Sequence, residues 1–90
     1  MNTNYIDKLV RIINHYTKTV FRYKVDIEND LVYIYHISFN SYKSSINALF
    51  DVKDLFEKTL NKEIKRVQNQ LILNLQDVID LYTILRIQGV

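Results

Sequence analysis

The sequence contains no cysteine and no proline, and its only glycine is Gly89, next to the end of the sequence. Without cysteine, the chain has neither disulfides nor a thiolate zinc site to strengthen a small core. One glycine cannot build the glycine-rich loop that holds nucleotide phosphates. The 90 residues must therefore be held together by side-chain packing, within the chain or with another copy.

Long apolar runs are also missing. No run approaches the roughly 20 residues that a membrane-spanning helix needs, and the first 20 residues lack the apolar segment of a signal peptide. An excess of one charge is absent too, because 12 basic and 10 acidic residues give a net charge of +2. With 48% hydrophobic residues, this balance excludes a disordered tail. We expect a cytoplasmic protein that does not contact a membrane.

A β-hairpin is predicted over residues 20–39. In its first half, four apolar residues alternate with charged ones: Phe21, Tyr23, Val25 and Ile27. This pattern is typical of a strand with one apolar and one hydrated face. The second half, residues 31–37, is apolar on both faces as far as His36. Asn29 and Asp30 lie between the halves and tolerate the left-handed conformation that tight loops require.

The length of the hairpin loop decides which residues of the second strand face the core, because a shift of one residue reverses every side chain. A two-residue loop at residues 29–30 places Lys24 opposite Tyr35. A three-residue loop gathers the apolar residues of both strands on one face, so we expect an odd-length loop. The core side of the second strand then holds Leu31, Tyr33, Tyr35, Ile37 and Phe39. Val32 and Ile34 remain on the far face, and this apolar pair predicts a cover: a second copy, a partner or the C-terminal helix.

Helical periodicity covers most of the remaining sequence. An apolar stripe predicts a helix over about residues 4–18, and a second, longer stripe predicts a helical region over about residues 44–88. A single helix of that length would be unusual in so small a chain. We expect at least one break, near Asn61 or within residues 69–74, because Asn74 followed by Asp77 is typical of a helix N-terminus.

These elements predict an α+β fold, a small single domain of order α-β-β-α-α in which a two-stranded antiparallel hairpin packs on helices. Between Asn61 and Gln70 only Ile64 and Val67 are apolar, so this segment should be hydrated on most sides. Residues 71–87 are apolar nearly all round. Such a helix is buried on more than one side, which favours an oligomer or a partner.

No group of residues points to catalysis or to a bound metal or cofactor. His15 and His36 belong to different elements, and no carboxylate stands at a spacing that would complete a metal site. Asp51, Asp54 and Glu57 share one helix face, where an acidic, hydrated surface explains them better than acid–base chemistry. We therefore expect a protein that is not an enzyme and uses no cofactor.

Two sets of residues are candidates for binding. The sequence contains seven tyrosines, and tyrosine is favoured at interfaces because its rigid ring buries a large area. We predict a partner or dimer interface at four residues: Val32, Ile34, Tyr5 and Tyr42. Basic residues could contact nucleic acid while tyrosines stack on bases: Lys18, Arg22, Lys24, Lys62, Lys65 and Arg66. Acidic neighbours dilute this basic set, so we favour a protein partner over nucleic acid.

The leading hypothesis is a small non-enzymatic protein-binding regulator or inhibitor. Ile, Asn, Lys and Tyr are abundant, and their codons are rich in A and T. This usage suggests a phage or mobile element of a low-GC bacterium. The alternative is a dimeric DNA-binding accessory or regulatory protein that uses the basic residues named above.

Overall fold

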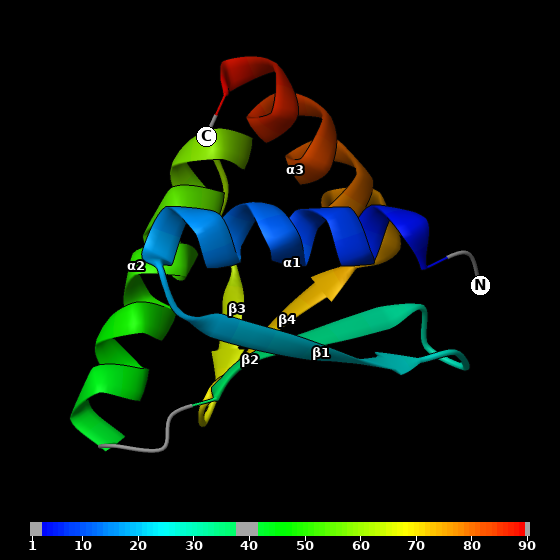
Figure 1. The fold of residues 1–90 in the computed structure, drawn as a ribbon. Coiled ribbons are helices and arrows are strands. Elements are labelled where there is room, and N and C mark those ends of the chain that lie inside the picture. The colour runs from blue at the N-terminus through cyan, green and yellow to red at the C-terminus, as the bar shows by residue number, and fades with distance from the viewer. Residues whose placement is uncertain (1–2, 38–41, 90) are drawn as a thin grey trace.

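The structure is a computed structural model that describes residues 3–37 and 42–89. Its elements are, in order, α1 (Asn4–Thr17), β1 (Val20–Asp26), β2 (Leu31–Ile37), α2 (Tyr42–Leu60), β3 (Lys65–Val67), β4 (Gln70–Asn74) and α3 (Leu75–Gln88). The strands form one antiparallel sheet in the order β1-β2-β4-β3. The three helices lie together on one side of it (Figure 1). The α+β class and the small single domain are confirmed, but the order is α-β-β-α-β-β-α.

The predicted helical region contains a second hairpin. α2 ends at Leu60 and is followed by Asn61 in the left-handed conformation, with φ of 54°. α3 begins after Asn74, whose side-chain oxygen accepts a hydrogen bond of 2.7 Å from the backbone N–H of Asp77. The sequence predicted at least one break, near Asn61 or within residues 69–74, and the helices end and begin at both places. Residues 65–74 between them, however, form β3 and β4 with a two-residue loop in which Gln68 has a φ of 53°.

The predicted register of the first hairpin is wrong. Asp26 pairs with Leu31 and Val25 with Val32, which leaves a four-residue turn at residues 27–30. One physical reason is the Asp26 carboxylate, which accepts hydrogen bonds from the backbone N–H of Asn29 at 3.3 Å and from its side-chain amide at 2.8 Å. These bonds stabilise a longer turn, and they leave the predicted first pairing residue, Ile27, 70% exposed.

This even-length turn reverses the orientation of every β2 side chain. Val32 and Ile34 are completely buried in the core, with 0% exposure, so they are not the interface that the sequence predicted. Tyr33 and Tyr35 point instead to the side of the sheet opposite the helices, and both are half-buried. The last two residues of the predicted hairpin, 38–39, lie outside the described residues.

The core lies between the helices and one face of the sheet. Every element except β3 contributes fully or almost fully buried apolar side chains, and the larger ones are Ile6, Leu9, Ile13, Phe21, Ile34, Leu49, Phe56, Leu71, Leu73, Leu81 and Leu85. Burying one such side chain stabilises the fold by about 1.5–3 kcal/mol. Since all helices pack on the same face, the described elements leave the other face open to solvent.

Two further expectations concern the second half of the chain. Within residues 61–69 only Ile64 is buried, so the predicted hydration of this segment is confirmed. α3 packs against α1, α2 and β4 of the same chain. These contacts bury Val78, Leu81 and Leu85 without a second copy, whereas Ile87 remains 77% exposed.

Candidate functional site

The open side of the sheet carries an ordered set of side chains. Strand pairing places two rows across all four strands: Lys24, Tyr33, Ile72 and Lys65 in one, and Arg22, Tyr35, Gln70 and Val67 in the other. Alternation along each strand turns these eight side chains away from the helices. We call them the open sheet face.

Two tyrosines occupy the middle of the open sheet face. Tyr33 and Tyr35 stand two residues apart on β2, an inner strand, so their Cα atoms are roughly 7 Å apart. The ammonium group of Lys24 lies 5.6 Å from the centre of the Tyr35 ring, a distance suited to a cation–π contact. Neighbours on both sides support the rings, which remain partly exposed to solvent.

Three exposed cations flank these tyrosines. Arg22 and Lys24 stand on β1, directly opposite Tyr35 and Tyr33, while Lys65 stands on β3 at the other edge of the sheet. Neighbouring strands are about 4.8 Å apart, so Lys24 and Lys65 are separated by roughly 14 Å at the backbone. Within the described residues, none of the three belongs to an ion pair. They are therefore available to a ligand.

Acidic residues are distributed differently from these cations. Six of the ten lie on helices: Asp7, Asp51, Asp54, Glu57, Asp77 and Asp80. Only Asp26 lies on a strand, at the end of β1, where its oxygens accept hydrogen bonds from Asn29. The strands carry four cations, namely Arg22, Lys24, Lys65 and Arg66. The sheet is thus basic although the net charge of the chain is only +2.

The other three predicted nucleic-acid contacts do not join this face. The ammonium group of Lys62 lies 2.7 Å from the carboxylate of Asp77. Arg66 points toward α2, where its guanidinium group lies 5.1 Å from the Phe50 ring and donates a 2.6 Å hydrogen bond to the carbonyl of Gln68. Lys18 follows α1 in the left-handed conformation. The structure therefore brings together half of the predicted basic set.

The remaining interface candidates are Tyr5 and Tyr42. Tyr5 is 39% exposed and makes an edge-to-face contact with Tyr82, at a centroid distance of 5.7 Å, where α1 meets α3. This contact belongs to the helical layer, away from the open sheet face. The side chain of Tyr42 lies outside the described part of the chain. The sequence prediction placed Tyr33 and Tyr35 in the core. The turn-forming pair Asp26 and Asn29 was the signal that could have indicated an even-length turn, which places both tyrosines on the open sheet face.

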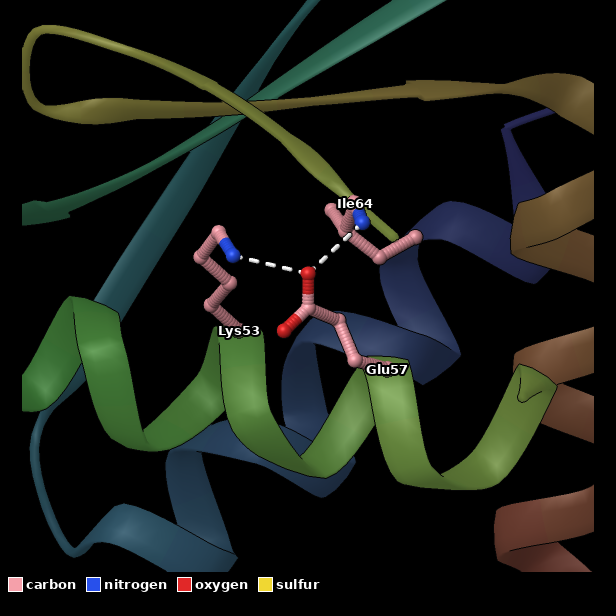
Figure 2. A network of polar contacts seen from close by, with 3 residues as sticks. All are labelled: Lys53, Glu57 and Ile64. Atoms are coloured by element: carbon pink, nitrogen blue, oxygen red, sulfur yellow. Dashed lines mark hydrogen bonds and ion pairs between the residues drawn. The ribbon is translucent and has the colours of Figure 1, made fainter. Parts of the chain in front are cut away.

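A small polar network holds the second hairpin in place. Figure 2 shows the Glu57 carboxylate of α2 between two donors, the Lys53 ammonium group at 2.7 Å and the backbone N–H of Ile64 at 2.9 Å. Both donors lower the pKa of Glu57, with Lys53 having the larger effect. Ile64 is buried and directly precedes Lys65. The network therefore fixes where Lys65 enters the sheet.

Across the residues that the structure describes, no cluster of side chains suggests catalysis. Among the described residues, no three His, Asp or Glu side chains are placed to share a metal ion. His36 contacts the Thr19 hydroxyl at 2.6 Å and the edge of Phe21, and burial lowers its pKa. None of the described helices combines the length and the hydropathy required to cross a membrane.

Comparison with protein-family models, with curated proteins and with solved structures finds no match to this chain.

Proposed function

We propose that this chain is a small non-enzymatic regulatory protein that binds nucleic acid through the open sheet face. The observation that carries this proposal is the pair of rows on a surface that no described helix covers: each tyrosine pairs with a cation on β1, and Lys65 ends the Tyr33 row on β3. Nucleic acids combine a line of negative charge with bases that have a π-face. The open sheet face offers a complement to each.

Electrostatics makes a second copy a poor occupant of this face. Face-to-face pairing of two chains would bring two basic surfaces together, and like charges across an interface cost several kcal/mol. An acidic ligand instead gains from the same charges. A homodimer that uses another surface stays a prediction, as do the cytoplasmic location and the origin from a phage or mobile element.

A protein partner is the second candidate, and one observation favours it. The open sheet face also contains apolar area, since Ile72 is half-buried and Val67 is 45% exposed. Tyrosine, arginine and apolar side chains together are common in protein interfaces. In this case the chain would act as a regulator or inhibitor that covers an acidic surface of its partner.

Binding to labelled oligonucleotides over a salt series tests the main proposal. Three phosphate contacts to a single strand give a slope of log K against log salt of about −2. The triple variant Arg22→Ala, Lys24→Ala, Lys65→Ala should lose most of the affinity at low salt and most of this slope. The fold should survive, because all three side chains are exposed.

The matched control removes three cations from the helices: Lys8→Ala, Arg11→Ala and Lys58→Ala. It changes the net charge equally and should bind almost as well as the unmodified protein. Equal loss in both variants would indicate nonspecific attraction and reject the open sheet face as the site. Absence of binding at low salt would reject nucleic acid altogether and leave the protein partner as the candidate.

A further inference from the structure

We infer that the open sheet face binds single-stranded nucleic acid, with one base stacked on Tyr33 and the next on Tyr35. This inference rests on the proposed function and names the form of the ligand. It follows from the spacing of the two rings, from the cation opposite each ring and from the shape of the surface around them.

The two tyrosines are spaced as successive stacking positions. They lie on one face of one strand, roughly 7 Å apart, which is about twice the separation of stacked bases along one strand of a duplex. Bases on both rings must therefore be unstacked from each other. A single strand can spread its bases in this way, whereas a duplex keeps them paired and stacked.

Each tyrosine has a cation as its pairing residue on the neighbouring strand. Arg22 is paired with Tyr35, and Lys24 is paired with Tyr33. A sugar–phosphate backbone that follows β1, with its bases lying over β2, meets one positive charge for each nucleotide. The two pairs have the same spacing along both strands, and the Lys24 ammonium group reaches along the sheet to lie 5.6 Å from the centre of the Tyr35 ring.

The other side of the tyrosines completes the surface. Ile72 follows Tyr33 across the sheet and Gln70 follows Tyr35, so one base edge meets an apolar side chain and the other meets an amide. Lys65 stands beyond Ile72 at the β3 edge, where it can contact a phosphate of a neighbouring nucleotide. Stacking on the rings and attraction to the phosphates tolerate any nucleotide sequence, and the Gln70 amide adds one group that can form a hydrogen bond with a base edge.

A duplex does not fit this surface equally well. Reading a duplex requires an element that enters a groove, commonly a helix or a two-stranded ribbon in the major groove. Among the described elements, all helices lie on the opposite side of the sheet (Figure 1), and both hairpins are joined into one four-stranded sheet instead of forming a separate two-stranded ribbon. The rings of Tyr33 and Tyr35 stand on an inner strand of this sheet, and the bases of a duplex, which are paired and stacked, do not offer their faces to such rings.

Fluorescence anisotropy with labelled oligothymidine, labelled oligouridine and a duplex of equal length tests this inference. We expect at least about tenfold tighter binding of a single strand than of the duplex at the same salt concentration. The two homopolymers separate DNA from RNA as the source of the strand. The double variant Tyr33→Leu, Tyr35→Leu should lose at least about 30-fold in affinity, because stacking of one base contributes roughly 5- to 150-fold.

Two variants keep the test independent of folding. Tyr33→Phe with Tyr35→Phe retains both rings and should bind within about threefold of the unmodified protein. Tyr16→Leu removes an exposed tyrosine from α1 and should change nothing. Circular dichroism and thermal unfolding verify that each variant is folded.

The outcomes separate the inference from the proposed function. Duplex binding as tight as single-strand binding, or full affinity in the folded leucine variant, would overturn the inference while nucleic-acid binding stands. Loss of affinity in the phenylalanine variant would also overturn it, since the hydroxyls and not the rings would then carry binding. No binding to any of the oligonucleotides would overturn both.

Discussion

Tyr33 and Tyr35 are partly exposed to solvent because their neighbours Val32 and Ile34 occupy the core. Along a strand, each residue that enters the core places the next one on the opposite face. The even-length turn goes with this orientation, and the Asp26 carboxylate stabilises that turn by accepting hydrogen bonds from Asn29. The turn interaction and the burial of Val32 and Ile34 together determine which residues of β2 can meet a ligand.

Substitutions at neighbouring positions of β2 should differ in their effect on stability, because one side chain lies in the core and the next on the open sheet face. Ile34→Ala removes a completely buried side chain and should lower the free energy of unfolding by about 2–5 kcal/mol. Tyr33→Ala should lower it by about 1 kcal/mol or less, because the open face loses mainly cross-strand contacts. Urea unfolding monitored by circular dichroism measures both. The reverse order of the two effects would support the odd-length loop instead.

His36 provides a residue-scale prediction about pH. Burial lowers its pKa below the ordinary value of about 6.5, so the unfolded chain binds a proton more readily than the folded one. Stability should therefore decrease as pH falls from about 7.5 through 6.5 toward the lowered pKa. Thermal unfolding at several pH values measures this trend. His36→Asn should remove it, whereas His15→Asn, at an exposed position, should retain it.

At the scale of elements, the second hairpin depends on α2 for its position. β3 has only three residues and contributes no buried side chain, so pairing with β4 alone would hold it weakly. Its entry is fixed by buried Ile64, whose backbone N–H donates to Glu57, and by the ion pair of Lys62 with Asp77 on α3. The β3 edge of the open sheet face is therefore attached to two helices.

Replacement of Glu57 should loosen this edge. Glu57→Gln loses the ion pair with Lys53 and weakens the hydrogen bond from the Ile64 N–H. Hydrogen exchange of the backbone amides of residues 64–67 should therefore be faster than in the unmodified protein, while exchange in β1 and β2 should change less. In the unmodified protein the lowered pKa of Glu57 gives a stabilising contribution that is complete above its ordinary value of about 4.5 and is lost as pH falls through the lowered pKa.

A matched control is Asp54→Asn, which removes an exposed ion pair with Lys58 on the same helix. Exposed pairs of this kind contribute little, so hydrogen exchange in residues 64–67 should not change in this variant. Equal acceleration in both variants, or none in Glu57→Gln, would contradict the role assigned to Glu57.

At the scale of the whole molecule, one layer of helices and one sheet divide the surface into two chemically different sides. The helical side carries most of the acidic residues and is where Tyr5 and Tyr82 meet. The other side carries the open sheet face. Elements of the same chain pack on α3 and bury Val78, Leu81 and Leu85, so oligomerisation is not needed to bury these three side chains.

Much of this fold could be predicted from local sequence pattern. Helix α1, the two strands of the first hairpin and the breaks at Asn61 and Asn74 follow from periodicity and capping residues. β3 and β4 could not be predicted in this way, since β4 is fixed by pairing with β2, a partner more than 30 residues away in sequence. Of the candidate site, only Arg22, Lys24 and Lys65 were predicted, because assignment of the tyrosines required the length of a turn.

Mapping the binding surface by NMR tests the central claim most directly. Uniformly labelled protein is titrated with unlabelled oligothymidine while backbone and side-chain shifts are followed. We predict that the largest shift changes fall on the open sheet face, at Arg22, Lys24, Tyr33 and Tyr35, with little change on α1 and α3. Shift changes concentrated around Tyr5 and Tyr82 on the helical side would contradict the claim that the open sheet face is the binding surface.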